Sequence, residues 1–242
     1  MWVWKILLII STTFMLLSCN AQYDYTAEEK EYIQTQTVLW ASADNFYPFI
    51  YIDTDGQSAG ISKDYMNLIT KKTGLKFTMA SHGQLMDQLD QLKHGSIEMI
   101  TSIRTTPERA VYASFTRPYI FADTVMIKRT NIPRNVGIGK GYAVKNYLEI
   151  ERKDLKIVEF ENDEQAFKEM QRGDIDSVVV DAVSAKFLIK KYRAMYDVIS
   201  VPYEYPLSFA VRKDDARLRV ILDKAIASIT PEEHTEIRRK WM

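Results

Sequence analysis

The segment around residues 106–109 carries an arginine in a position that suits anion binding. Thr106 is a favourable N-cap, and Pro107 is a favourable first helical residue because proline lacks the amide hydrogen that this position leaves unpaired. Arg109 then falls on the first turn of a short helix, where the helix dipole disfavours a cation. A guanidinium beside free backbone N–H groups can hold an anion, and a solvated surface arginine is the alternative.

The apolar pattern predicts the elements that position this arginine. From Thr37 onwards, short apolar runs alternate with amphipathic ones, which is typical of an α/β layered fold. A second series of the same kind starts near residue 130. Strands are expected over 38–41, 75–79, 97–103, 136–139, 156–160 and 175–180, and helices over 62–73 and 142–150. Ligands of open α/β sheets bind beyond the carboxyl ends of the strands. Arg109 follows the end of the expected strand 97–103, so it lies where a ligand is expected to bind.

Composition excludes several classes of function. The chain has 242 residues, 46% of them hydrophobic, with 32 basic and 32 acidic side chains. A formal net charge of zero gives no reason to expect a nucleic acid as partner. The 3 His are widely spaced and there is 1 Cys, so neither a metal site nor a disulfide framework can be assembled. No cofactor is expected.

The N-terminal segment predicts export and a lipid anchor. Residues 1–18 have the apolar run of a signal peptide, too short for a comfortable membrane span. The run ends in Leu16-Leu17-Ser18-Cys19, which matches a bacterial lipobox in which Cys19 is lipidated. An ordinary signal peptide with an incidental cysteine is the alternative. Residues 19–36, polar in composition, are then predicted to be a lipidated tether that holds the protein on a membrane surface.

Several motifs in a fixed order indicate a family. Thr-Pro-Glu-Arg at 106–109 is followed by Phe-Thr-x-Pro-Tyr at 115–119, residues 46–65 form an opening strand, hairpin and helix, and residues 173–181 form a later strand. Together they resemble the extracytoplasmic solute-binding proteins of the type 2 periplasmic-binding fold, in the amino-acid-binding branch. The resemblance covers nearly all of the chain after its N-terminal segment.

The resemblance implies an α/β protein of two lobes around a cleft. Each lobe is a mixed sheet flanked by helices, with residues 37–128 and 206–242 in lobe 1 and residues 129–205 in lobe 2. The chain crosses between the lobes twice, near 125–130 and 203–207. Such double crossovers allow hinge closure on a ligand.

The same resemblance assigns candidate ligand-binding residues. Arg109 matches the arginine that grips a ligand carboxylate, and Asp181 matches the aspartate that accepts from the ligand ammonium group. Tyr142 and Ala143 match backbone N–H positions on the far side of the carboxylate, and Phe46 matches an aromatic wall. The alternatives are a structural salt bridge for Arg109, a helix N-cap for Asp181 and a core position for Phe46.

Two further candidates, Ser102 and Arg104, depart from the family pattern. The stretch from Glu98 to Arg109 is one residue shorter than the commonest pattern, and Arg104 falls near a position where a small hydroxyl touches the ligand ammonium. A second arginine in the cleft would favour a doubly anionic ligand. Alternatively, Arg104 pairs with Glu108 or Asp123 and never meets the ligand.

The resulting functional prediction is a binding protein rather than an enzyme. It is expected in the periplasm or at the cell surface as a lipid-anchored monomer. There it would deliver a small amino acid or carboxylate to an ABC permease or present it to a membrane sensor. The shorter spacing before Arg109 is similar to that of receptor domains associated with sensors. The alternative is a lyase on the same scaffold, similar to cyclohexadienyl dehydratases, whose acid would have to be Glu108 or Asp181.

Overall fold

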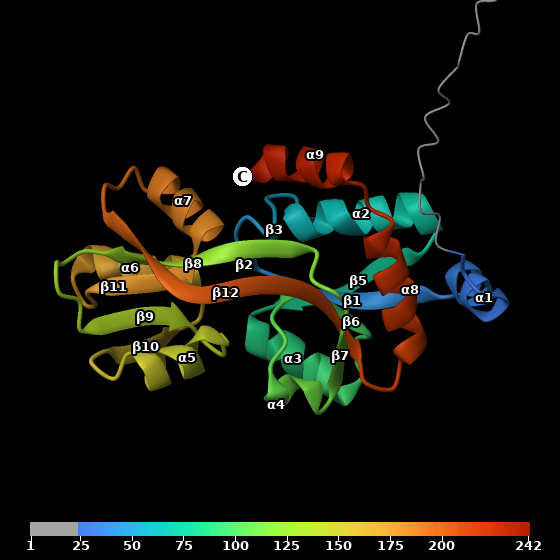
Figure 1. The fold of residues 1–242 in the computed structure, drawn as a ribbon, viewed down its shortest axis with the longest axis horizontal. Coiled ribbons are helices and arrows are strands. Elements are labelled where there is room, and N and C mark those ends of the chain that lie inside the picture. The colour runs from blue at the N-terminus through green and yellow to red at the C-terminus, as the bar shows by residue number, and fades with distance from the viewer. Residues whose placement is uncertain (1–23) are drawn as a thin grey trace, which may run out of the picture.

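The computed structural model describes residues 24–242, which form two lobes joined by two long strands (Figure 1). The predicted signal peptide and Cys19 lie outside the described residues. One continuous sheet has the strand order β10-β9-β11-β8-β12-β6-β1-β5, and β7 also pairs with β12. The expected two-lobed α/β architecture is therefore confirmed at the level of topology.

Lobe 1 contains the strands that lead to Arg109. They are β1 (Thr37–Ala43), β5 (Lys76–Gly83), β6 (Met99–Ile103), β7 (Ala113–Phe115) and the second half of β12 (Asp197–Arg212). The helices are α2 (Ile61–Thr73), α3 (Leu85–His94), α4 (Pro107–Ala110), α8 (Ala216–Ala227) and α9 (Pro231–Trp241). In Figure 1, α2 and α9 lie on one side of the sheet and α3 and α4 on the other. Separate apolar clusters pack on the two faces, which fixes the sheet between helical layers.

A small hairpin sheet projects from lobe 1 toward the cleft. It consists of β2 (Asn45–Phe46), β3 (Ile50–Ile52) and β4 (Ser58–Ala59). Gly60 then turns the chain into α2 with a φ of 121°. A Cβ at Gly60 would lie 2.6 Å from the Phe49 carbonyl oxygen, so only glycine allows this close passage.

Lobe 2 repeats the layered arrangement with different connections. Its strands are β8 (Ile120–Lys128), β9 (Asn135–Gly139), β10 (Lys156–Phe160), β11 (Ser177–Asp181) and the first half of β12. Parallel pairing joins β10, β9 and β11, whereas β8 runs antiparallel to both β11 and β12. The helices α5 (Val144–Glu151), α6 (Asp163–Arg172) and α7 (Ala182–Lys191) cover the sheet.

The two crossings lie within β8 and β12, whose pairing continues through both lobes. Ile120 pairs with Leu207 on the lobe 1 side, and Thr124 pairs with both Val201 and Asp181 on the lobe 2 side. The first crossing thus falls a few residues before the predicted 125–130. The register shift between Val201 and Glu204 marks the second, at the start of the predicted 203–207.

The prediction that residues 19–36 form an unfolded tether is wrong for α1 (Ala27–Thr35). Thr26 and Glu29 form a capping box, and Ile33 is buried in the lobe 1 core. The Glu29 carboxylate also accepts from the Lys224 ammonium at 2.6 and 2.9 Å. The Thr-x-x-Glu capping signal is present in the sequence. The helix was not predicted because its composition is polar and Ile33 is the one apolar side chain that it buries.

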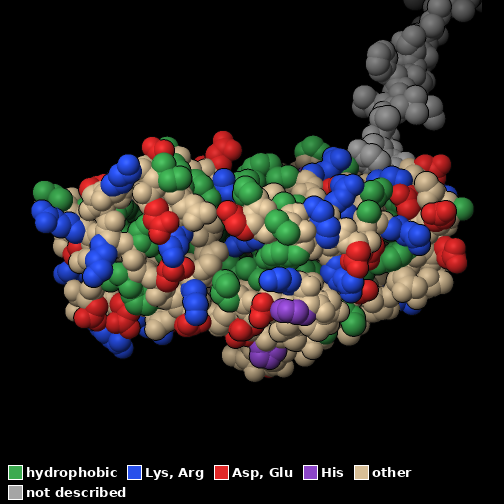
Figure 2. All heavy atoms as spheres, turned by 90° about the horizontal axis from the view of Figure 1, so that it is seen from below, with side chains coloured by type: hydrophobic (Ala, Val, Ile, Leu, Met, Phe, Trp, Pro, Cys, Tyr) green, Lys and Arg blue, Asp and Glu red, His purple; other side chains and the backbone are tan. Residues whose placement is uncertain are grey.

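The surface is of mixed charge on the face drawn in Figure 2, where basic and acidic side chains are interspersed over both lobes. Within residues 24–242, no helix is both long and apolar enough to span a membrane.

Candidate functional site

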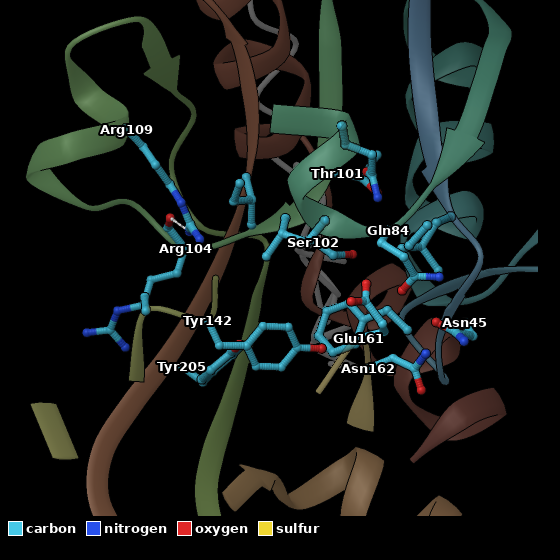
Figure 3. Close-up of a pocket in the computed structure, with 17 residues that line it drawn as sticks. Asn45, Gln84, Thr101, Ser102, Arg104, Arg109, Tyr142, Glu161, Asn162 and Tyr205 are labelled. Carbon is cyan, nitrogen blue, oxygen red and sulfur yellow. Dashed lines mark hydrogen bonds between the residues drawn. The ribbon is translucent and has the colours of Figure 1, made fainter. Parts of the chain in front are cut away.

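A cavity that is partly open to solvent lies where the lobes meet. Both lobes contribute to its walls, and Figure 3 shows the lining side chains. The lobes are closed around it, because the Ser184 hydroxyl donates to the Tyr47 carbonyl at 2.8 Å and the Tyr47 and Phe187 rings stack at 4.9 Å. The lining residues are Ala43, Asn45, Phe46, Ile50, Gln84, Leu85, Gln88, Thr101, Ser102, Ile103, Arg104, Arg109, Tyr142, Ala143, Glu161, Asn162 and Tyr205.

Arg109 is a buried cation that forms no ion pair within residues 24–242. The Thr106 hydroxyl caps α4 by accepting from the Arg109 N–H at 3.3 Å, and the arginine is 6% exposed. Its guanidinium donates to the Arg104 carbonyl at 2.7 Å and, across the cleft, to the Gly141 carbonyl at 2.8 Å. No carboxylate within residues 24–242 forms an ion pair with it, and burial lowers its pKa. Arg109 therefore has the charge and the donors to receive an anion.

Ser102 lines the cavity, but its N–H and hydroxyl form hydrogen bonds within lobe 1. Its backbone lies in the left-handed region with a φ of 52°. The Ser102 N–H donates to the Tyr119 hydroxyl at 3.0 Å, and its hydroxyl bonds that of Ser62. Ser62 and Tyr119 also share a hydrogen bond of 2.7 Å, which closes a buried triad. The triad holds the end of β6 immediately before Arg104 and Arg109. Sequence reasoning placed Tyr119 in a motif but assigned no role to it or to Ser62.

Arg104 stacks on an aromatic ring rather than pairing with an acid. Its guanidinium carbon lies 3.8 Å from the centroid of the Tyr203 ring, and its Nη1 is buried without a hydrogen-bond partner within the described residues. Neither Glu108 nor Asp123 forms an ion pair with it in this part of the chain. Figure 3 shows the Arg104 head group extending away from Tyr142 and Tyr205. Its backbone carbonyl, in contrast, faces Arg109.

On the lobe 2 side, the Tyr142 backbone amide that was expected to meet a carboxylate already has a partner within the lobe, as does the neighbouring Gly141 amide. The Gly141 N–H donates to the Glu159 carboxylate and the Tyr142 N–H to the Gly139 carbonyl, both at 3.1 Å. The cavity instead meets the Tyr142 side chain, together with Ala143. The Tyr142 ring approaches Phe46 edge-on at 6.0 Å, and Phe46, which lines the cavity, also packs on Phe49 at 4.9 Å. Its role as an aromatic wall over a ligand stays a prediction.

Asp181 acts as a helix cap and does not line the cavity. Its Oδ1 accepts from the Val183 and Ser184 N–H groups at 2.9 and 2.8 Å, which is the capping role weighed from sequence. It is 2% exposed, and burial raises its pKa to about 6. Asp181 is not among the residues that line the cavity in this closed form, and the ligand contact implied for it stays a prediction.

A second buried acid, Asp163, stands close enough to Asp181 for the charges to interact. Burial, and then the charge of Asp181, raises the pKa of Asp163 to about 8. The Tyr142 hydroxyl donates to its Oδ2 at 3.2 Å, whereas its Oδ1 has no hydrogen-bond partner among the described residues. Sequence reasoning missed Asp163, because an acid after the Asn162 cap is an ordinary helix start.

Neither of the acids named for a lyase lines the cavity. Glu108 is exposed at the start of α4, and the Asp181 oxygen that accepts from two amides is committed to capping α7. The cavity wall contains Glu161, an exposed residue whose carboxylate lies 3.8 Å from the Lys140 ammonium.

Comparisons with known proteins agree with this architecture. The family model of the bacterial extracellular solute-binding proteins, family 3, matches residues 38–242. Virulence sensor protein BvgS of Bordetella pertussis is 26% identical over 231 residues, which cover 90% of this chain and 19% of BvgS. The chain thus spans about a fifth of the length of that relative. ABC transporter arginine-binding protein 1 of Escherichia coli is 23% identical over 210 residues, which cover 80% of this chain and 86% of that protein. The solved periplasmic VFT2 domain of Bordetella pertussis BvgS matches with a TM-score of 0.82 at 24% identity, over 90% of this chain and 99% of that one.

Proposed function

Because this chain belongs to the bacterial extracellular solute-binding proteins of family 3, we propose that it binds an amino acid or a related small carboxylate between its lobes. Arg109 carries this proposal. A buried guanidinium costs free energy unless an anion compensates it, and its planar fork suits the two oxygens of a carboxylate. In the closed cavity it is satisfied only by backbone carbonyls. A ligand carboxylate would replace neutral acceptors with a charged one.

The output of binding is the delivery of a closed, ligand-loaded protein to a membrane partner. Relatives include both a sensor protein and a transporter-associated binding protein, so a sensor and an ABC permease are the two candidate partners. Within this proposal the protein acts as a monomer and not as an enzyme. Its lobes shift between open and closed states according to which state the ligand favours.

Lipidation of Cys19 is part of the same proposal and would hold the protein at a membrane surface. The lipobox sequence before Cys19 supports it. Palmitate labelling of the full chain in bacteria should mark the wild type and not the Cys19→Ser variant. Equal labelling of both chains would remove the anchor from the proposal.

A thermal-shift screen of residues 24–242 against amino acids and dicarboxylates tests the binding function. A ligand present at about 100 times its Kd adds ~2.7 kcal/mol, which should raise the melting temperature by roughly 5 °C or more. Arg109→Ala should weaken binding by at least about 100-fold, because it removes a buried charged partner. Arg172→Ala is a matched control, since this exposed arginine pairs only with Glu169 in the described chain.

Two results would overturn the proposal. Wild-type affinity in the Arg109→Ala variant would show that the anion binds elsewhere. Turnover of prephenate-like compounds, with no shift from any amino acid or carboxylate, would favour the lyase on this scaffold.

A further inference from the structure

Asp163 is the buried acid of lobe 2 whose carboxylate the surrounding residues leave incompletely satisfied; the buried Ser177 hydroxyl also lacks a partner in the described chain but carries no charge. Asp163 is the first residue of α6 and is 5% exposed. Its Oδ2 accepts from the Tyr142 hydroxyl at 3.2 Å, but its Oδ1 has no hydrogen-bond partner within residues 24–242. Leaving a buried carboxylate oxygen unpaired costs free energy, so a hydrogen-bond donor from outside the described chain would stabilise Asp163.

The charges around Asp163 do not compensate it. Asp181 acts on it as a like charge, and both acids in turn raise the pKa of Tyr205, with burial the larger cause. The groups that face Asp163 are therefore Asp181 at the end of β11, Tyr142 before α5 and Tyr205 in β12. Arg109 acts on Tyr205 from the opposite lobe but is not among the charges that act on Asp163.

Tyr142 covers this acidic pair on the side of the cavity. It lines the cavity, whereas Asp163 and Asp181 do not, and its hydroxyl is the donor that reaches Asp163. Figure 3 shows the Tyr142 ring lying across the middle of the site, next to Tyr205. Gly139 makes room for this position, because a Cβ there would lie 2.5 Å from the ring.

We infer that Asp163 is a second carboxylate of the subsite for the ligand ammonium group, shared with Asp181 and covered by Tyr142 in the ligand-free closed form. This inference rests on the proposed function. The ammonium group would replace the Tyr142 hydroxyl as donor and would supply the partner that Asp163 lacks. The ligand class is then a primary amine with a carboxylate, which Arg109 would hold from the other lobe.

The pair of acids also couples binding to protons. Two adjacent carboxylates hold a proton more tightly than one, and the raised pKa of Asp163 agrees with this. An ammonium group favours the ionised forms of both acids, so binding near neutral pH releases a proton from the pair. A subsite built on Asp181 alone would release less.

Titration calorimetry with the amino acid that gives the largest shift among the twenty tests this inference on residues 24–242. Asp163→Asn keeps the shape and removes the charge, and we expect its affinity to fall at least tenfold, as for loss of a charged hydrogen bond. We also expect the proton release, measured in two buffers of different ionisation enthalpy, to decrease. Asp176→Asn is the matched control, because Asp176 accepts from the Arg134 and Asn135 N–H groups at 2.9 Å in the same lobe. It should bind like the wild type.

Tyr142→Phe independently tests whether the Tyr142 hydroxyl competes with the ligand for Asp163. It keeps the ring but removes the donor that competes with the ligand, so we expect affinity to rise severalfold. Unchanged affinity and proton release in Asp163→Asn would overturn the inference while leaving the proposed function intact. Equal affinity of the wild type for the amino acid and its 2-oxo counterpart would also overturn it. Failure of every amino acid to bind the wild type would instead overturn the proposed function itself.

Discussion

The two walls of the cleft bury charge of opposite sign and satisfy it to different degrees. On the lobe 1 wall, Arg109 uses both terminal nitrogens on backbone carbonyls, and the triad of Ser62, Ser102 and Tyr119 is closed. On the lobe 2 wall, Asp163 keeps an oxygen without a partner in the described chain. Lobe 1 therefore holds the Arg109 cation in a satisfied frame, although the Arg104 Nη1 on the same wall lacks a partner in the described chain, whereas in lobe 2 it is a buried acid that lacks a donor.

Desolvation acts on both walls and explains why their pKa shifts are mirror images. Burial lowers the pKa of Arg109 and raises the pKa of Asp163 and Asp181, since in each case it disfavours the charged form. A ligand that brings a carboxylate to one wall and an ammonium group to the other would reverse both shifts. The comparison thus supports a zwitterion as the solute that closes the lobes.

The pH dependence of stability is the largest effect expected from the acidic wall. The folded-state pKa of Asp163, about 8, and of Asp181, about 6, lie above the unfolded value of 3.8. The folded protein therefore holds more protons between these values, and the stability it gains from them is lost as pH rises. Asp163→Asn should gain at least ~2 kcal/mol in unfolding free energy relative to wild type between pH 5 and 9, at ~1.4 kcal/mol per pKa unit.

Urea unfolding of the two chains at several pH values measures this difference. Comparing variant with wild type cancels acids whose pKa is lowered, such as Asp176 and Glu29, because both chains contain them. A difference in unfolding free energy that stays constant across this range would mean that Asp163 is not a buried, uncompensated acid. The contrast between the two walls would then be lost.

Much of the frame followed from the sequence because it depends on local patterns. Alternating apolar runs gave the layers, and Thr106 with Pro107 placed Arg109 on its short helix, as found. The lobe 2 wall was less accessible to such reasoning. Whether the Tyr142 amide or its side chain meets the cavity depends on Gly139 and Glu159, which approach it from other elements.

Asp163 and Arg104 both have surroundings that local sequence patterns could not predict. An acid at a helix start is usually solvated, and only the packing of lobe 2 makes Asp163 a buried partner of Asp181. The partner of Arg104 is a ring almost one hundred positions later in the chain, brought close by the crossing strand β12. Non-local contacts of this kind leave no periodic signal in the sequence.

Substitution of Arg104 is expected to have the smallest effect on stability and ligand affinity. It tests whether a second arginine of lobe 1 contacts the ligand. Since its guanidinium stacks on Tyr203 and, in Figure 3, extends away from Tyr142 and Tyr205, Arg104→Gln should cost only about 0.5–1 kcal/mol of stability from the lost cation–π contact. Ligand affinity should change less than about threefold, which corresponds to under ~0.7 kcal/mol.

Calorimetry with glutamate and glutamine on the wild type and Arg104→Gln measures both the affinity and the preference between the two ligands. A loss as large as that of Arg109→Ala, greater for glutamate than for glutamine, would place a second cation on the ligand and make the cleft a receptor for diacids. An unchanged ratio would leave Arg109 as the one arginine of the described chain that binds the carboxylate.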